Sequence, residues 1–416
     1  MLELMPPGSF PLCADQAFER EAADELECLV GTVRESTSNF TPAGLLLTGS
    51  FARGEGVIVR DTSHGFRWLS DVECLVVIPD SSRSELPRIR QALEEAAQHA
   101  NGDSRRKCQG LAIELSPILA SRLGAMRPTI FTCELLEHGK LLWGKPEEIP
   151  MPPRFELARD LLGRDAFRLL NNRIVEQVAV KLSCEVESGA GRTAATAYAL
   201  SKFWIELGTS LSVFLDCYRT SYRARHAALA NALASESGVL GVKAAEVLES
   251  ELASAMALKL GHISTDQYCA ERDFERVGDI ASRIWWWETG WLLGESTGRG
   301  GWRDVTTRLR RVETTAARIR DWGRLLLRTS AASNLSSGSL KEVSRAGSFG
   351  NAIYAAGYLL YFFWDQIGSG RGAGEEIGDG LNRLFGVTDT DGPVHRRLLA
   401  ERTLRAWRTH LRSAAA

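Results

Sequence analysis

Two carboxylates, Asp71 and Glu73, stand two residues apart where the apolar run CLVVI begins. Residues two apart on a strand point to the same face, so both carboxylates project toward one point. Two anions on an otherwise buried strand repel each other and resist desolvation unless a cation lies between them. A hard cation such as Mg2+ takes oxygen ligands and keeps positions open for water and phosphates. The pair therefore predicts a divalent-metal site for Mg2+, with Mn2+ as a second candidate.

A Gly-Ser turn precedes this pair in the sequence. Gly49 and Ser50 directly follow the apolar segment LLLT. A glycine at that point lets the backbone approach a ligand closely, and a helix that followed it would aim its N-terminal amides at an anion. Residues 45–78 therefore predict a strand, a turn, a long loop and a second strand that begins at the carboxylate pair.

A third acidic residue, Glu114, is the one charge in the apolar run LAIELSPI, which predicts a third strand. Glu114 has two interpretations. Ile113 and Leu115 on the alternate face would suffice for a half-buried strand, with Glu114 facing solvent. Its place one strand after the carboxylate pair favours the second interpretation, a third ligand of the metal site.

The Gly49–Ser50 turn, the Arg-Gly-Glu sequence at 53–55, the D-x-E pair and the later acidic residue together resemble the polymerase-beta-like nucleotidyltransferase superfamily. The resemblance covers roughly residues 40–145 closely and the rest loosely. It implies that Glu114 is the third carboxylate and that a helical region follows a small catalytic sheet. The loop from Ser50 to Asp71 is longer than the superfamily's usual spacing, and it forms either a hairpin or a lid.

The resemblance also implies a division of roles. The D-x-E pair would hold two Mg2+ ions, and Glu114 would share the ion nearer the attacking group. The Gly49–Ser50 turn would grip the β- and γ-phosphates of a nucleoside triphosphate. Arg53 would either assist there or only tie the loop. Lys202 would either reach the triphosphate, as a lysine of the first helices often does in the superfamily, or be a surface lysine with a buried stem.

Several aromatic and charged residues leave alternatives open. Trp285–Trp287 with Trp291 predict core packing, with base or sugar stacking as the minority interpretation. The Gly-rich stretch 368–380 favours a flexible connection over a phosphate-binding loop. The arginines of the last helix form either a solvated face or a phosphate or RNA contact. A cluster beyond Lys202 either lines the same cleft or has no part in it: Tyr218, Arg219, Tyr222, Arg223 and Arg225.

Periodicity predicts the elements that position these residues. Helices are expected over 14–36, 85–100 and 129–139 beside the sheet, and strand signals vanish from Leu157 onward. The later helices are expected near 157–186, 192–220, 222–235, 239–258, 266–293, 303–329, 350–367 and 393–413, with a Ser/Gly-rich loop or hinge at 331–349. The predicted fold class is α+β, a small mixed-sheet nucleotidyltransferase domain followed by a large all-helical domain.

Length and composition bound this interpretation. The 416 residues predict more than one domain, and we expect a catalytic domain at 1–150, a helical domain lining the nucleotide and acceptor cleft at 151–330, and a helical extension at 331–416. The net charge of -2 argues against a protein held to nucleic acid by overall charge. The N-terminus lacks the pattern of a signal peptide and the chain lacks a long apolar run, which predicts a cytoplasmic protein without a membrane partner.

The sequence supports two functional hypotheses. The first is a metal-dependent nucleotidyltransferase that moves a nucleoside monophosphate from an NTP, with ATP favoured, to an acceptor hydroxyl and releases pyrophosphate. The acceptor is open between a small molecule, a sugar phosphate, a protein side chain and a nucleic acid. The second is a non-catalytic nucleotide-binding or protein-interaction module, such as a regulator or an antitoxin-like partner.

Overall fold

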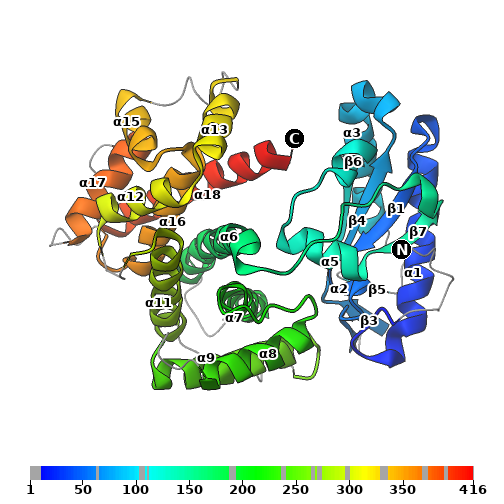
Figure 1. The fold of residues 1–416 in the computed structure, drawn as a ribbon, viewed down its shortest axis with the longest axis horizontal. Coiled ribbons are helices and arrows are strands. Elements are labelled where there is room, and N and C mark those ends of the chain that lie inside the picture. The colour runs from blue at the N-terminus through cyan, green and yellow to red at the C-terminus, as the bar shows by residue number, and fades with distance from the viewer. Residues whose placement is uncertain are drawn as a thin grey trace. The chain divides into compact units, whose positions relative to one another are not determined.

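The α+β architecture predicted from the sequence is confirmed: a four-stranded mixed sheet with helices precedes a large all-helical region (Figure 1). The computed structural model describes residues 11–61, 65–102, 108–109, 112–186, 194–235, 240–263, 268, 274–295, 300–327, 336–367, 373–387 and 392–415.

The chain forms two compact units. The first unit consists of residues 1–162 together with Tyr218–Ala228 and Met256–Ser264. The second unit consists of Gly163–Cys217, Leu229–Ala255 and Thr265–Ala416. The region 331–416, which the sequence sets apart as an extension, therefore belongs to the same unit as the preceding helices.

The central sheet of the first unit has the strand order β6-β4-β1-β7. Its strands are β1 (Gly44–Thr48), β4 (Val72–Ile78), β6 (Ile113–Leu119) and β7 (Lys140–Gly144). Strand β1 runs antiparallel to both β4 and β7, whereas β4 and β6 run parallel. The two central strands are almost wholly buried, which explains their continuous apolar sequences.

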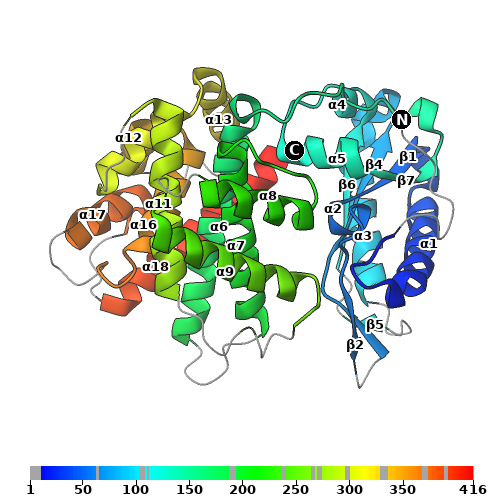
Figure 2. The ribbon, with the colours of Figure 1, turned by 60° about the horizontal axis from the view of Figure 1, so that its bottom comes forward.

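The long loop between the Gly-Ser turn and the carboxylate pair forms a hairpin, one of its two predicted alternatives. Strands β2 (Ile58–Asp61) and β3 (Gly65–Trp68) pair antiparallel, and the short β5 (Cys108–Gln109) joins β3 in parallel. This second sheet extends away from the central sheet (Figure 2). Trp68 anchors its base, since its buried ring lies 5.1 Å from the ring of Phe51.

Two layers of apolar side chains cover the central sheet. One face packs on α1 (Glu19–Ser36) and α3 (Leu86–Gly102), whose core residues include Leu29 and Leu93. The other face carries the smaller cluster that includes Leu75 and Leu135, from β4 and α5. The short helices of the first unit are α2 (Gly49–Ala52), α4 (Ala120–Gly124) and α5 (Ile130–His138), with 3-10 turns at Gln16–Phe18, Ser38–Phe40, Asp80–Glu85 and Pro146–Glu148.

The rest of the chain is helical, as predicted from Leu157 onward. The helices are α6 (Arg159–Val186), α7 (Ala194–Phe214), α8 (Tyr222–Ser235), α9 (Val242–Lys259), α11 (Phe274–Leu293), α12 (Trp302–Val312), α13 (Thr315–Leu327), α15 (Ser337–Ala346), α16 (Phe349–Phe362), α17 (Ala373–Phe385) and α18 (Gly392–Ala415). The tryptophan cluster lies in the core of the second unit. Trp285 is fully buried and donates to Asn171 (3.0 Å), and Trp286 donates to Tyr358 (2.7 Å).

Three local predictions were wrong. The single helix expected at 303–329 is two helices, because Glu313 adopts an extended backbone conformation between α12 and α13. Part of the Ser/Gly-rich stretch 331–349 forms α15, since the side chain of Ser336 caps its first turn and Gly347 ends it with φ +88°. The described part of the Gly-rich stretch lies in α17, where Ile377 and Leu381 are buried on one face, and residues 368–372 lie outside the described residues.

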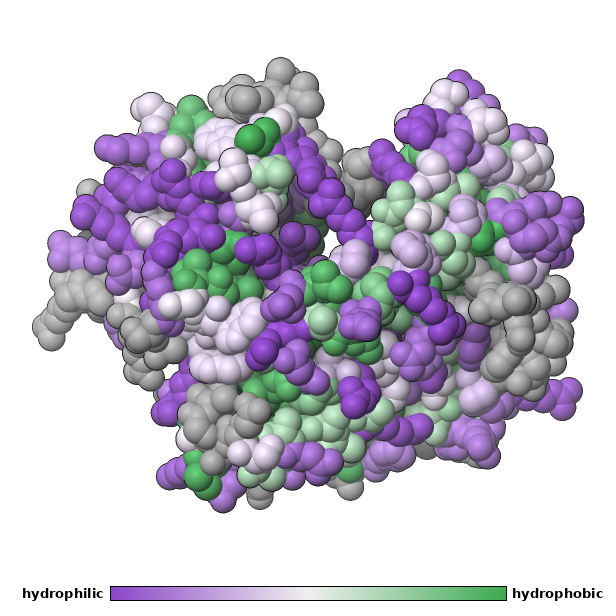
Figure 3. All heavy atoms as spheres, viewed as in Figure 1, coloured by the Kyte–Doolittle hydropathy of each residue, from purple (hydrophilic) through white to green (hydrophobic). Residues whose placement is uncertain are grey.

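On the face of the molecule shown in Figure 3, hydrophilic residues cover most of the described surface and apolar residues lie in small groups. Within the described ranges, none of the helices combines the length and the apolar composition that crossing a bilayer requires.

Candidate active site

The turn after β1 owes its shape to Gly49. This residue has φ +67°, a left-handed conformation that L side chains rarely adopt. The turn leads into α2, which is only four residues long. The sequence predicts helix amides aimed at an anion, but one turn of helix carries little of the dipole that a longer helix would supply. A ligand at this turn would therefore contact the backbone of the turn and not the end of a long helix. Ser50, the second residue of the turn, is buried.

Two of the three predicted carboxylates, Glu73 and Glu114, share one face of the sheet. Residue Glu73 of β4 is the direct register partner of Glu114 in the parallel strand β6. Side chains alternate along both strands, and Leu75, two residues after Glu73, faces the α5 side of the sheet. Glu73 and Glu114 therefore project toward that side, and Asp71 lies directly before β4.

The pair Glu73 and Gly49 connects the carboxylates to the turn. A Cβ atom on residue 49 would lie 2.2 Å from Oε2 of Glu73, so the carboxylate packs directly against the glycine backbone. The hydroxyl of Thr48 donates to the carbonyl oxygen of Glu73 at 3.1 Å. The turn and the second strand are thereby held together at the atoms where the sequence predicts the metal and the triphosphate to meet.

The carboxylates differ in exposure and do not form a closed cluster. Glu73 is half-buried, whereas Asp71 and Glu114 are exposed. Among the described residues, which include all three, the structure contains no group of three or more acidic, histidine or cysteine side chains placed to hold a metal.

Arg53 lies in an ion-pair network inside the first unit. Its guanidinium contacts Glu55 at 3.2 Å and Glu134 of α5 at 2.5 Å, and it stacks on the ring of Tyr222. Burial opposes the charged form, but the neighbouring carboxylates of Glu134 and Glu55 more than compensate and raise the pKa of Arg53. Only 4% of the Arg53 side chain is exposed. This burial matches the second expectation for Arg53, that it ties the loop.

Glu55 is a structurally important residue to which the sequence analysis assigned no role. Its side chain is 3% exposed, and its two oxygens accept hydrogen bonds from the backbone N–H groups of Tyr222 (3.1 Å) and Arg223 (3.2 Å). These amides open α8, so Glu55 caps that helix from 167 residues away. An acidic residue between two glycines, Gly54 and Gly56, soon after a buried strand and one helical turn was the available signal.

The aromatic and basic cluster at 218–225 takes part in the same network. Arg225 is buried and contacts Glu134 at 2.8 Å, and the hydroxyl of Tyr218 donates to the same carboxylate at 3.1 Å. Burial raises the pKa of Tyr218, so its hydroxyl stays protonated and acts as a donor. These side chains serve internal contacts of the first unit.

Lys202 belongs to the second unit, on α7. It is half-buried, and its ammonium lies 5.2 Å from the centre of the Tyr198 ring. Burial raises the pKa of Glu176 on α6, and the charges of Arg173 and Lys202 oppose that rise. Within its own unit, Lys202 thus has an aromatic neighbour and a carboxylate neighbour.

Comparison of the chain with protein-family models, with curated proteins and with solved structures found no match. The resemblance stated above therefore rests on the motif residues themselves and on the positions just described.

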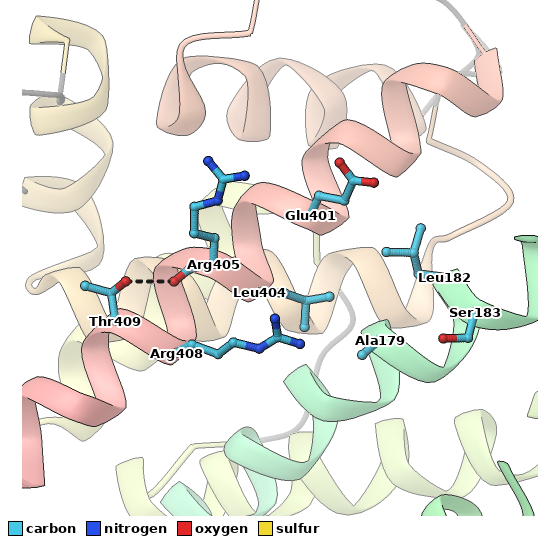
Figure 4. A pocket seen from close by; sticks show the side chains of 8 residues that line it. All are labelled: Ala179, Leu182, Ser183, Glu401, Leu404, Arg405, Arg408 and Thr409. Carbon is cyan, nitrogen blue, oxygen red and sulfur yellow. Dashed lines mark hydrogen bonds between the residues drawn. The ribbon is translucent and has the colours of Figure 1, made fainter. Parts of the chain in front are cut away.

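The arginines of the last helix take different roles. Arg396 pairs with Glu185 of α6, and Arg397 pairs with Glu401 along α18. Arg405 and Arg408 line a groove of about 460 Å³ between α18 and α6. Figure 4 shows Arg408 extending between the two helices, whereas the guanidinium of Arg405 points away from α6. Of the two arginines, only Arg408 therefore directs its charge into the groove.

Proposed function

We propose that this protein is a metal-dependent nucleotidyltransferase that transfers a nucleoside monophosphate from an NTP, with ATP favoured, to an acceptor hydroxyl and releases pyrophosphate. The observation that carries the proposal is the register of β4 and β6. It sets Glu73 beside Glu114, Asp71 directly precedes β4, and Glu73 packs against the Gly49 turn. Three carboxylates and an open backbone turn at one end of a sheet suit the binding of a metal-bound triphosphate.

The donor set fits a hard divalent cation. All three side chains offer carboxylate oxygens, the ligands that Mg2+ prefers, and the exposure of Asp71 and Glu114 leaves room for water and phosphate oxygens. Asp71 and Glu73 would hold two Mg2+ ions, or Mn2+, and Glu114 would share the ion nearer the acceptor. When bound, such ions neutralise phosphate charge and polarise the reacting oxygens.

The chain's own residues would bind and orient the substrate. Gly49 leaves room for the carboxylate of Glu73, so a metal held by Glu73 would lie beside the backbone of the turn, where Ser50 offers a hydroxyl. Arg53 would act indirectly, since its contacts with Glu55 and Glu134 hold the segment that follows the turn. In the transfer, the acceptor oxygen forms a bond to the α-phosphorus, the bond from that phosphorus to the pyrophosphate oxygen breaks, and the hydroxyl proton passes to solvent.

A non-catalytic nucleotide-binding or protein-interaction module remains the second candidate. One observation favours it: among the described residues, the three carboxylates are not drawn together into a ligand group. A module that binds a nucleotide without turnover has no need of a closed metal site.

The deciding experiment is the paired measurement of NTP binding and pyrophosphate release in Glu114→Gln. Gln keeps the size and hydrogen bonding but removes the charge. We expect near wild-type affinity for Mg-NTP and turnover reduced about 10²-fold or more, the scale of losing one electrostatic contact to the transition state. Glu94→Gln is the matched control, because Glu94 is an exposed residue of α3.

The outcomes separate the two candidates. Wild-type turnover in Glu114→Gln would contradict the assignment of the third carboxylate. Binding of Mg-NTP by the wild type, with no pyrophosphate release for any NTP and acceptor tried, would favour the non-catalytic module.

A further inference from the structure

The second unit contains a cavity of about 520 Å³ that the proposed reaction does not use. Its lining comes from α6, α11, the residues before α12, the end of α16 and the residues that follow α16, all within one unit. Pockets for small organic ligands typically have volumes of about 300 to 1,000 Å³, with mostly apolar or aromatic walls and a few polar groups. The size of this cavity lies within that range.

The walls of the cavity are aromatic and rigid. Tyr358 and Phe362 lie one turn apart on α16, with ring centres 4.4 Å apart and ring planes tilted by 48°, and Phe362 meets Tyr361 edge to face at 4.9 Å. Trp286 donates its indole N–H to the hydroxyl of Tyr358, which also lies 3.2 Å from the hydroxyl of Ser282. Because these rings are locked by mutual contacts, the cavity is preformed for a flat or aliphatic group.

The charges around the cavity decide the sign of the ligand. The ammonium of Lys181 donates to the carbonyl oxygen of Tyr361 at 2.8 Å and lies over the Tyr361 ring. The carboxylate of Asp279 pairs with Arg283 at 2.9 Å. Asp365 lines the cavity and is exposed, and among the described residues it has neither an ion-pair nor a hydrogen-bond partner. The available charge is therefore negative.

We propose that this cavity binds an organic cation. Its ammonium or guanidinium group pairs with Asp365, and its carbon skeleton packs against the half-buried rings of Phe362 and Phe363. The rings of Tyr361 and Trp286 already face the cations of Lys181 and Arg308, so the ion pair with Asp365 is what selects the ligand's charge. The proposal concerns the second unit alone and holds whether or not the first unit transfers nucleotides.

The test uses the full-length protein and three probes that share one aromatic ring: phenethylamine, phenethyl alcohol and phenylacetate. Calorimetry of each probe measures its affinity. We expect phenethylamine to bind about tenfold or more tightly than the neutral alcohol, and phenylacetate to bind most weakly. Equal affinities for the three probes would overturn the proposal.

The first variant is Asp365→Asn. It should lower the affinity for phenethylamine about tenfold and leave that for phenethyl alcohol unchanged, because only the charge is removed. Glu401→Gln is the control, since Glu401 is an exposed carboxylate on α18 that does not line this cavity. An unchanged affinity for phenethylamine in Asp365→Asn would contradict the ion pair.

The second variant fills the cavity. Gly278 lies in α11 at the cavity wall, and a Cβ atom there would meet no atom within 4 Å. Gly278→Leu should therefore fold, since leucine favours helix, and it should abolish phenethylamine binding. Gly323→Leu in α13 is the matched control, because a Cβ atom there is equally unobstructed and Gly323 does not line the cavity. Wild-type binding in Gly278→Leu would show that the probe binds elsewhere.

Discussion

The carboxylate of Glu55 accepts a hydrogen bond from the backbone N–H of Tyr222 at 3.1 Å, which joins the loop after the Gly-Ser turn to the first turn of α8. The same carboxylate contacts Arg53, and Arg53 contacts Glu134. The network is buried and includes two arginines, so it stabilises the first unit only while every member has its partners.

Replacing Glu55 by alanine should destabilise the first unit strongly. The change leaves two backbone amides and part of the Arg53 guanidinium buried without an acceptor, and the loss of one member of a buried ion pair costs about 3 to 5 kcal/mol of unfolding free energy. Urea denaturation of Glu55→Ala measures this loss. Glu94→Ala, an exposed substitution, should stay within about 0.5 kcal/mol of wild type. Equal stability of the two variants would contradict a structural role for Glu55.

Replacing Gly49 by alanine should disturb the candidate site and the backbone together. A Cβ atom there would collide with Oε2 of Glu73, and the left-handed conformation costs an L residue about 1 to 2 kcal/mol. We expect lower stability and weaker Mg-NTP binding, measured on the same samples by melting and calorimetry. Gly31→Ala in α1 is the control, because its Cβ would meet nothing within 4 Å, and it should stabilise the protein by about 0.5 to 1 kcal/mol. Unaltered stability and nucleotide binding in Gly49→Ala would count against the close packing of this turn.

Asp71 should link metal binding to stability. In the presence of a non-hydrolysable NTP, Mg2+ should raise the melting temperature of the wild type, since a ligand at about 100 times its Kd stabilises the bound state by about 2.7 kcal/mol. Asp71→Asn should remove that shift, whereas Asp24→Asn on the exposed side of α1 should retain it. A full shift in Asp71→Asn would mean that the metal binds elsewhere.

Glu288 of α11 is a fully buried carboxyl in the second unit. The hydroxyl of Ser210 donates to its Oε2 at 2.9 Å, and its Oε1 has no hydrogen-bond partner among the described residues. Burial raises the pKa of Glu288 well above its ordinary value, and the hydrogen bond from Ser210 only partly opposes that rise. The folded protein therefore holds this group protonated at a pH where the unfolded chain has released the proton.

The stability of the second unit should consequently fall as the pH rises. Below the ordinary glutamate pKa of 4.5, both states are protonated and the contribution of Glu288 is complete. Above it, the unfolding free energy of wild type relative to Glu288→Gln should decrease by up to about 1.4 kcal/mol per pH unit, until the folded-state pKa is reached. Urea denaturation of both proteins from about pH 5 to about pH 8 measures this difference. A difference that is constant across the range, or that grows with pH, would contradict a buried neutral carboxyl.

The sequence alone determined the properties that depend on neighbours along the chain. Long apolar runs mark the buried strands β1 and β4, and β4 begins at Val72, directly after Asp71. Helical periodicity identified the all-helical region from Leu157 onward. These predictions rest on local geometry, which a few consecutive residues specify.

Only the tertiary structure decided which distant residues meet. The register of two parallel strands sets Glu73 beside Glu114, and a carboxylate near the start of the chain caps α8 at Tyr222. The helices α15 and α17 were not predicted for the same reason. Burial against neighbouring helices stabilises them despite their Ser/Gly-rich composition. Strand register, long-range capping and the burial of charges depend on free energies that arise when segments far apart in the sequence exclude water between them, and no local pattern encodes that pairing.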